Sequence, residues 1–146
     1  MTFLNFSIFF FYDKMIKTKL HYNMIAYHVT TLENYVDIEK NGLVPKIGPR
    51  SENLGEVDPR IYLFPDKITC SDALMNWLGE EFDEVDSFII LEVDISKFDK
   101  KSDVGYEVTV KEHIPTSHIL KVFNEVEFEQ SLKIKDTNKK KNKLKP

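Results

Sequence analysis

Hydrophobic residues fall into short runs along the chain, and the spacing of each run predicts a secondary-structure element. Residues 24–29, MIAYHV, are almost continuously apolar, which is typical of a buried strand. In the segment that follows, TTLENYVDIEKNGL, Thr30 and Glu33 have capping-box spacing and Gly42 suits the end of a helix. The pattern therefore predicts a strand followed directly by a short helix from Leu32 to Asn41.

The next segments predict a long loop and a second strand and helix. Residues 44–60, VPKIGPRSENLGEVDPR, contain three prolines and two glycines without periodicity, which indicates a long surface loop. Such loops in compact domains are usually functional or mobile. The β-rich run RIYLF stops at Pro65, and TCSDALMNWLG begins with capping residues and ends in glycine. We therefore expect a short strand at 60–64 and a helix at 69–79.

Three further strands are predicted in the second half of the chain. The runs are DSFIILEVDI (86–95), GYEVTVKEHI (105–114) and HILKVFNEVEF (118–128). The first is the most continuously apolar, so we expect it near the centre of a sheet and covered on both faces. Two helices followed by a run of strands are typical of an α+β domain with a mixed or antiparallel sheet. The sequence predicts one such domain over residues 24–130, with two short helices.

Charge separates the chain into an acidic body and a basic end. The last fourteen residues carry seven lysines and one aspartate, whereas residues 1–132 carry a net charge of −10. An acidic body argues against a broad nucleic-acid-binding face, although the lysines could attract phosphates weakly. The composition of residues 131–146 predicts a disordered, solvated tail. The total length and the 42% hydrophobic content suit one folded core.

The amino-terminal segment does not predict a membrane anchor or a signal peptide. Its apolar run from Phe3 to Tyr12 is too short to span a bilayer, has no basic residues before it and meets Asp13. We expect residues 1–23 to be an extension that contributes little to the fold, and we expect no membrane partner. Because Cys70 is the only cysteine, no internal disulfide framework exists, which favours a reducing, cytoplasmic location.

Candidate chemistry is confined to polar residues inside or beside the apolar strands. The sequence has no phosphate-binding glycine loop, no Cys/His spacing for zinc and no serine in a nucleophile elbow, so no metal site is predicted. His28 alone is more often a hydrogen-bonded structural residue, and Tyr62 alone is a good strand former. Glu107 is more informative, because a carboxylate is depleted in β-branched strands and is costly to bury unpaired. Its structural explanation is a side chain on the solvent face of the strand.

Together, the motifs around these residues resemble the ADP-ribosyltransferase superfamily. YHVT in the first strand, RIYLF before a helix and GYEVTVKEHIPTSHILKV with its glutamate resemble the His-Tyr-Glu branch, which includes poly-ADP-ribose polymerases and diphtheria-type toxins. The resemblance covers roughly residues 24–123, and YHVTTLENYVDIEKNGLVP is similar to the opening of bacterial and phage toxin members that modify DNA. Val29 replaces the glycine of many polymerase-type members. Gly105 replaces the first glutamate of a Glu-x-Glu pattern, which argues against arginine acceptors.

The resemblance implies NAD as substrate and a role for each matching residue. Glu107 would be the catalytic carboxylate that grips the ribose 2′-hydroxyl and stabilises oxocarbenium character at the anomeric carbon. The Tyr62 ring would stack on nicotinamide, and His28 would form a hydrogen bond with a ribose hydroxyl. The backbone of Val29 would contact the nicotinamide amide. Arg50, in the long loop, would meet the pyrophosphate as a forked cation.

The implied activity is mono-ADP-ribosylation of an unidentified protein or nucleic-acid acceptor, with release of nicotinamide. Two alternatives stay open. The chain could be a catalytically silent binding module on the same scaffold, because a fold does not settle function. It could also be a small nucleic-acid-binding protein that uses its lysine tail, which the acidic body disfavours.

Overall fold

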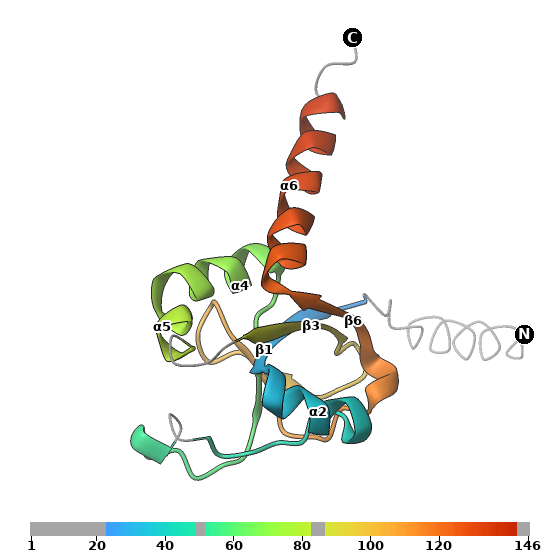
Figure 1. The fold of residues 1–146 in the computed structure, drawn as a ribbon. Coiled ribbons are helices and arrows are strands. Elements are labelled where there is room, and N and C mark those ends of the chain that lie inside the picture. The colour runs from blue at the N-terminus through green and yellow to red at the C-terminus, as the bar shows by residue number, and fades with distance from the viewer. Residues whose placement is uncertain (1–22, 49–51, 83–86, 143–146) are drawn as a thin grey trace, which may run out of the picture.

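Two three-stranded antiparallel sheets and their covering helices make up the fold (Figure 1). The computed structural model describes residues 23–48, 52–82 and 87–142. The predicted extension over residues 1–23 lies outside these ranges except for Asn23. The α+β class predicted from the sequence is confirmed, and every strand pair that is present is antiparallel.

The first sheet has the order β1-β3-β6, with β1 at Ile25–Thr31, β3 at Phe88–Asp94 and β6 at Ile119–Asn124. The central position predicted for the most apolar strand is therefore confirmed. Leu91 and Ile90 in β3 are both fully buried, and they belong to two different hydrophobic clusters. Both faces of this sheet are thus covered, which explains why β3 is apolar from Phe88 to Leu91.

The second sheet has the order β2-β5-β4, with β2 at Ile61–Leu63, β5 at Val108–Val110 and β4 at Lys100–Lys101. The strand expected over 105–114 is thus only three residues long. The apolar side chains of the second sheet face the first sheet, and the two sheets together form an inner cluster. This inner cluster includes Ala26, Leu43, Ile61, Leu63, Leu91, Val93, Val108, Val110 and Ile114. The opposite face of the second sheet carries polar side chains.

A single β-bridge joins the two sheets. Tyr27 in β1 and Phe64, just after β2, exchange both backbone hydrogen bonds, each with an N···O distance of 2.8 Å. Through this bridge the six strands follow the order 4-5-2-1-3-6. Within the described ranges no further pair of residues bridges β1 and β2, so the two strands separate on the side of His28 and Tyr62.

The first predicted helix is confirmed as α2, Leu32–Asn41. Its N-cap is Thr31, whose side chain accepts a backbone N–H three residues later, whereas the expected cap, Thr30, is buried in β1. The helix ends at Gly42, which has φ +76°. A Cβ there would lie 2.3 Å from the carbonyl oxygen of Ile114, so the position requires glycine for both conformation and space.

The second helical segment is longer than predicted. It consists of α4 (Lys67–Ala73), a π-helical turn η1 (Leu74–Leu78) and α5 (Gly79–Glu81), and its N-cap is Asp66. It covers the second face of the first sheet. There it builds a helix-side cluster whose buried members are Tyr27, Phe64, Cys70, Ala73, Leu78, Ile90, Phe123 and Phe128.

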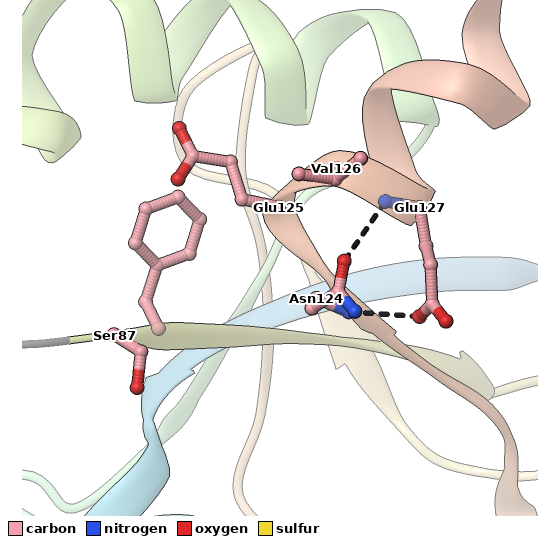
Figure 2. Close-up of a pocket in the computed structure, with 6 residues that line it drawn as sticks. Ser87, Asn124, Glu125, Val126 and Glu127 are labelled. Atoms are coloured by element: carbon pink, nitrogen blue, oxygen red, sulfur yellow. Dashed lines mark hydrogen bonds between the residues drawn. The ribbon is translucent and has the colours of Figure 1, made fainter.

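The C-terminal part of the chain differs from the sequence prediction. The strand expected over 118–128 follows a short 3₁₀ turn, η2 (Thr116–His118), and stops at Asn124, after which the helix α6 runs from Glu125 to Asn142. A capping box starts it: Asn124 Oδ1 accepts the Glu127 N–H at 2.9 Å, and Glu127 Oε2 accepts the Asn124 N–H at 3.1 Å (Figure 2). The boundary expected at residue 130 therefore falls inside a helix, and residues 131–142 are helical.

Helix α6 is attached to the body near its beginning. Phe128 is 2% exposed, and its ring meets the rings of Tyr27 and Phe123 edge-on, at centroid distances of 6.0 and 5.7 Å. The C-terminal turns of α6 project away from the other elements drawn in Figure 1. In the part of the chain that the structure describes, no helix has the length and apolar character needed to cross a membrane.

Candidate functional site

The split between β1 and β2 exposes backbone groups that a continued ladder would use. The backbone N–H and C=O of Tyr27 both form hydrogen bonds with Phe64. In an antiparallel sheet both groups of a residue point to the same neighbouring strand, so Tyr27 and Glu92 on β3 are a non-hydrogen-bonded pair. Backbone direction alternates along a strand, so the N–H and C=O of Val29 also point away from β3 and toward β2. Neither group has a hydrogen-bond partner in the described part of the chain.

His28 occupies the position at which the two strands separate. Its Nδ1 lies 2.8 Å from the carbonyl oxygen of Tyr62, the acceptor that a continued ladder would offer to the N–H of Val29. Since a carbonyl only accepts, Nδ1 carries the hydrogen in the neutral ring. The histidine ring therefore replaces the hydrogen bond that the Val29 N–H would form with Tyr62 in a continued sheet, and β1 and β2 stay apart at this position.

The protonation state of His28 follows from its surroundings. Burial lowers the pKa of the ring below its ordinary value of 6.5, against the opposing effect of the bond to Tyr62. The ring is therefore neutral near pH 7, and Nε2 is an acceptor. No described residue bonds Nε2, and every fully buried side-chain nitrogen or oxygen in the described ranges has a partner. Nε2 is therefore not completely enclosed by the described residues.

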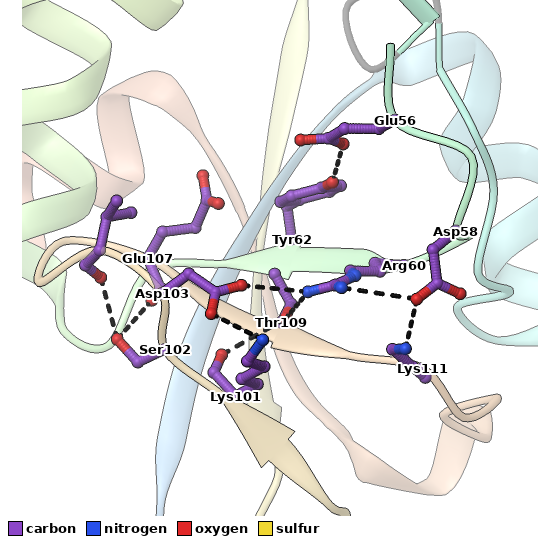
Figure 3. A network of polar contacts seen from close by, with 11 residues as sticks. Glu56, Asp58, Arg60, Tyr62, Lys101, Ser102, Asp103, Glu107, Thr109 and Lys111 are labelled. Carbon is purple, nitrogen blue, oxygen red and sulfur yellow. Dashed lines mark hydrogen bonds and ion pairs between the residues drawn. The ribbon is translucent and has the colours of Figure 1, made fainter. Parts of the chain in front are cut away.

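Tyr62 and Glu107 lie on the polar face of the second sheet. Ile61 and Leu63 point into the inner cluster, so the side chain of Tyr62 points to the opposite face. Tyr62 pairs with Thr109, and Figure 3 shows the side chains of Tyr62 and Glu107 rising from the same face of the sheet. The Tyr62 hydroxyl donates to the carboxylate of Glu56, which comes from the long loop (Figure 3).

The turn between β4 and β5 fixes the backbone of Glu107. The N–H of Glu107 donates to the carbonyl of Val104 at 3.2 Å, and the hydroxyl of Ser102 lies 2.9 Å from the carbonyl oxygens of both Val104 and Glu107. The neighbouring Tyr106 ring meets Trp77 of η1 edge-on at 6.2 Å. Glu107 therefore precedes β5 by one residue and sits in an ordered turn that is tied to the helices.

An ion-pair network covers the rest of this polar face (Figure 3). Arg60, with a side chain 19% exposed, reaches Asp103 at 3.2 Å and Asp58 at 3.4 Å. Lys111 pairs with Asp58, and this hydrogen bond lowers the pKa of that carboxyl group; Lys101 does the same for Asp103. The guanidinium of Arg60 thus binds the loop to the sheet and is already matched by two carboxylates.

The sequence-predicted residues are brought together to different degrees. The split gathers His28, the backbone of Val29 and Tyr62, but His28 contacts the carbonyl of Tyr62 and not its ring. Glu107 shares a face with the Tyr62 ring, whereas His28 leaves β1 on the side of Ala26 and the inner cluster. Arg50 lies outside the described residues. No group of three potential metal ligands forms within the described ranges.

Sequence reasoning missed two residues that hold the site together, Glu56 and Ser102. Glu56 lies in the segment already marked as a long loop, but nothing in its spacing indicates a bond to a tyrosine six residues later. Ser102 is close in sequence to Glu107 and occurs in a turn-forming stretch, KSDVG, which is the only available signal.

A surface depression of about 290 Å³ lies elsewhere, where β3 and β6 meet α6 (Figure 2). It is lined by Ser87, Phe88, Asn124, Glu125, Val126 and Glu127. Its polar groups include the capping box, whose hydrogen bonds are satisfied within the helix start. This depression therefore reflects the geometry of the strand-to-helix junction, and none of the sequence-predicted residues lines it.

Comparison with known proteins adds no relative to this geometry. No protein-family model matches the chain, and no curated protein matches its sequence.

Proposed function

We propose that the protein is an NAD-dependent mono-ADP-ribosyltransferase, which transfers ADP-ribose to a protein or nucleic-acid acceptor and releases nicotinamide. The observation that carries the proposal is the split between β1 and β2. There, His28 is bonded to the Tyr62 carbonyl, the amide and carbonyl of Val29 have no partner in the described part of the chain, and Glu107 shares the polar face of the second sheet with the Tyr62 ring.

The open backbone pair of Val29 suits the carboxamide of nicotinamide. A primary carboxamide offers one acceptor oxygen and an NH₂ donor, which match one N–H and one C=O of a strand edge. The Val29 side chain packs against the helix-side cluster, so the contact uses only the backbone and does not require glycine. The Tyr62 ring would supply a stacking surface whose orientation is held by the bond to Glu56.

His28 would orient the sugar. Its neutral state, favoured by burial, leaves Nε2 as an acceptor for a ribose hydroxyl, while the bond of Nδ1 to Tyr62 prevents the ring from turning. This contact exists before the reaction starts, so it contributes to NAD binding more than to the chemical step.

Glu107 would act on the transition state. As the bond between nicotinamide and ribose breaks, nicotinamide leaves with the bonding electron pair and positive charge develops at the anomeric carbon. A carboxylate that accepts a hydrogen bond from the 2′-hydroxyl stabilises that charge. The acceptor nucleophile then forms a bond to the anomeric carbon and loses its proton.

The test combines calorimetric NAD binding with a nicotinamide-release assay. Glu107→Gln should keep NAD affinity within about threefold and lower turnover by roughly a hundredfold or more, the scale of losing one preorganised transition-state contact. Tyr62→Ala and His28→Ala should weaken binding itself. Glu39→Gln, an exposed glutamate on α2, is the matched control and should change neither quantity.

Two results would contradict the proposal. If the protein does not bind NAD, the proposed binding site is wrong. If turnover is unchanged in Glu107→Gln, the proposed catalytic role of Glu107 is wrong. NAD binding without any nicotinamide release, with every candidate acceptor tried, would instead identify the chain as a catalytically silent binding module on the same scaffold.

A further inference from the structure

Trp77 lies between the two segments that carry the candidate stacking tyrosine and the candidate catalytic carboxylate. Its ring meets the rings of Phe64 and Tyr106, each at a centroid distance of 6.2 Å, with interplanar angles of 59° and 64°. Phe64 follows Tyr62 by two residues, and Tyr106 directly precedes Glu107. One side chain of the turn η1 therefore links the end of β2 to the turn before β5.

Glu107 depends on the placement of its turn, because it lies just beyond the sheet ladder. The pairing of β2 with β5 reaches Val108, the residue after Glu107. The hydrogen bonds of the Glu107 N–H and the Ser102 hydroxyl join atoms within residues 102–107. These bonds fix the shape of the turn, but they do not fix its distance from the rest of the domain.

Contacts at both ends tie this turn to other elements. Asp103 pairs with Arg60 at 3.2 Å, but the Asp103 side chain is 52% exposed, so water competes for the ion pair. Near the other end, the Tyr106 ring packs edge-on against Trp77, in an arrangement that aromatic pairs prefer. The aromatic contact therefore determines where the Glu107 end of the turn lies.

The backbone around Trp77 is specified by the sequence. The turn η1 closes with a hydrogen bond from the N–H of Gly79 to the carbonyl oxygen of Leu74. A Cβ at Gly79 would lie 2.2 Å from that oxygen, so any other residue would shift the turn. Leu78 is 9% exposed and anchors the turn in the helix-side cluster. Such π-helical turns occur frequently at functional sites, and here the turn gives Trp77 a fixed backbone.

We infer that Trp77 is a positioning residue for the proposed reaction: by joining Tyr106 to Phe64, it holds the Glu107 carboxylate in place relative to Tyr62. The inference rests on the proposed function and adds to it a residue of the helical segment. Because Glu107 acts on the transition state, loss of this placement lowers the rate of the chemical step more than it weakens NAD binding. A misplacement of about 1 Å can cost on the order of a hundredfold in rate.

Steady-state kinetics of nicotinamide release by the full chain test this role. Trp77→Leu removes the aromatic contact and should lower kcat at least about tenfold, while KM for NAD stays within about threefold. Trp77→Phe keeps an aromatic ring and should restore kcat to within about threefold of the unsubstituted chain. Tyr106→Leu removes the same contact at a residue 48% exposed, so it should reproduce the loss even if Trp77→Leu folds poorly.

A double substitution separates positioning from general destabilisation. If Trp77 acts through Glu107, Trp77→Leu should lower kcat no further in a chain that already carries Glu107→Gln. The control is Phe82→Leu, because Phe82 ends the same helical segment and packs on Phe88 at 5.6 Å rather than on Tyr106. This control should leave kcat and KM unchanged even where the melting temperature falls.

Hydrogen–deuterium exchange measures the same link without turnover. The Glu107 amide is bonded to the Val104 carbonyl, and it should exchange at least about tenfold faster in Trp77→Leu. In Phe82→Leu its exchange should stay as in the unsubstituted chain.

Three results would overturn the inference while nicotinamide release by the unsubstituted chain still supports the proposed function. They are unchanged kcat in both Trp77→Leu and Tyr106→Leu, an equal loss in Phe82→Leu, or a further loss when Trp77→Leu is added to Glu107→Gln. Absence of nicotinamide release by the unsubstituted chain would instead contradict the proposed function and the positioning role together. Faster exchange of the Glu107 amide in Trp77→Leu would then show only that Trp77 orders the turn.

Discussion

Replacing Phe128 by alanine tests how α6 is held on the domain. The Phe128 ring is 2% exposed and lies between the rings of Tyr27 and Phe123. Truncation to alanine removes the buried ring and leaves a cavity that rigid neighbouring rings can only partly fill. No other residue between Glu125 and Ile134 is as deeply buried, so this side chain anchors the start of the helix.

The expected cost lies in the upper range for core substitutions. Phe→Ala changes at buried sites lower the free energy of unfolding by about 3–5 kcal/mol. Each of the two edge-to-face contacts adds roughly 0.5–1.5 kcal/mol beyond area burial, which favours the upper end. For a domain of this size, the melting temperature should fall by roughly 10–20 °C. Phe128→Leu keeps most of the volume and should cost only about 1–2 kcal/mol.

Urea denaturation followed by circular dichroism gives the free energies directly. Val126→Ala is the matched control, because Val126 is on the same helix and 62% exposed; its effect should stay within about 0.5 kcal/mol. Deleting residues 134–146 should leave the melting temperature nearly unchanged, because the described part of this segment, up to Asn142, projects from the body as the end of α6. A loss below about 1 kcal/mol in Phe128→Ala would refute the docking of α6 through this ring, and a large loss on deletion would show that the basic end docks onto the acidic body.

Three further predictions concern His28, Gly42 and Cys70. Burial lowers the pKa of His28 in the folded state, so unfolded chains take up the proton first as the pH falls below 6.5. The free energy of unfolding should then decrease by up to about 1.4 kcal/mol per pH unit. His28→Gln should remove this pH-dependent component from melting curves. Gly42→Ala should cost at least about 2 kcal/mol in urea titrations because of its φ of +76° and the carbonyl of Ile114, whereas Gly48→Ala, with open space around it, should be nearly neutral. Cys70 is fully buried and its pKa is raised to about 12 by burial, so maleimide should label it at pH 8 only after denaturation; labelling of the native protein at the rate of a free thiol would contradict this.

The elements that were predicted correctly are those determined by interactions between residues close together in the sequence. The helix at Leu32–Asn41 is bounded by a threonine cap and a glycine stop, both of which act within a few residues. The central position of β3 followed from its apolar run, because a strand covered on both faces has no polar side. Both predictions needed no knowledge of distant contacts.

The start of α6 shows where the alternating pattern misleads. Residues 118–128 alternate well enough for one strand, yet the Asn124 and Glu127 side chains each bond the backbone of the other and begin a helix there. The spacing of these two residues was a readable capping signal, and it outweighed the alternation. The lysine-rich composition that suggested disorder is also compatible with a helix, since lysine has a high helix propensity.

The arrangement of the candidate residues could not be predicted from the sequence. The order of the His28, Tyr62 and Glu107 motifs indicated which residues to compare, but the relation between them depends on the bridge of Tyr27 to Phe64, 37 positions apart in the sequence. No local pattern shows that β1 and β2 meet once and then separate. The contact of His28 with a backbone carbonyl, and the bond of Tyr62 to Glu56, follow from that separation.

The strand order also has a consequence for how the chain folds during synthesis. Every ladder joins segments that are distant in sequence, except the small hairpin of β4 and β5: His28 pairs with Leu91, and Tyr62 with Thr109. Pairings of this kind require large loops to close first, which slows folding. At translation rates of about 5–20 residues per second, β1 leaves the ribosome several seconds before β3 exists. The strand that carries His28 therefore waits as an unpaired apolar edge, and it is the segment that a chaperone would protect on the nascent chain.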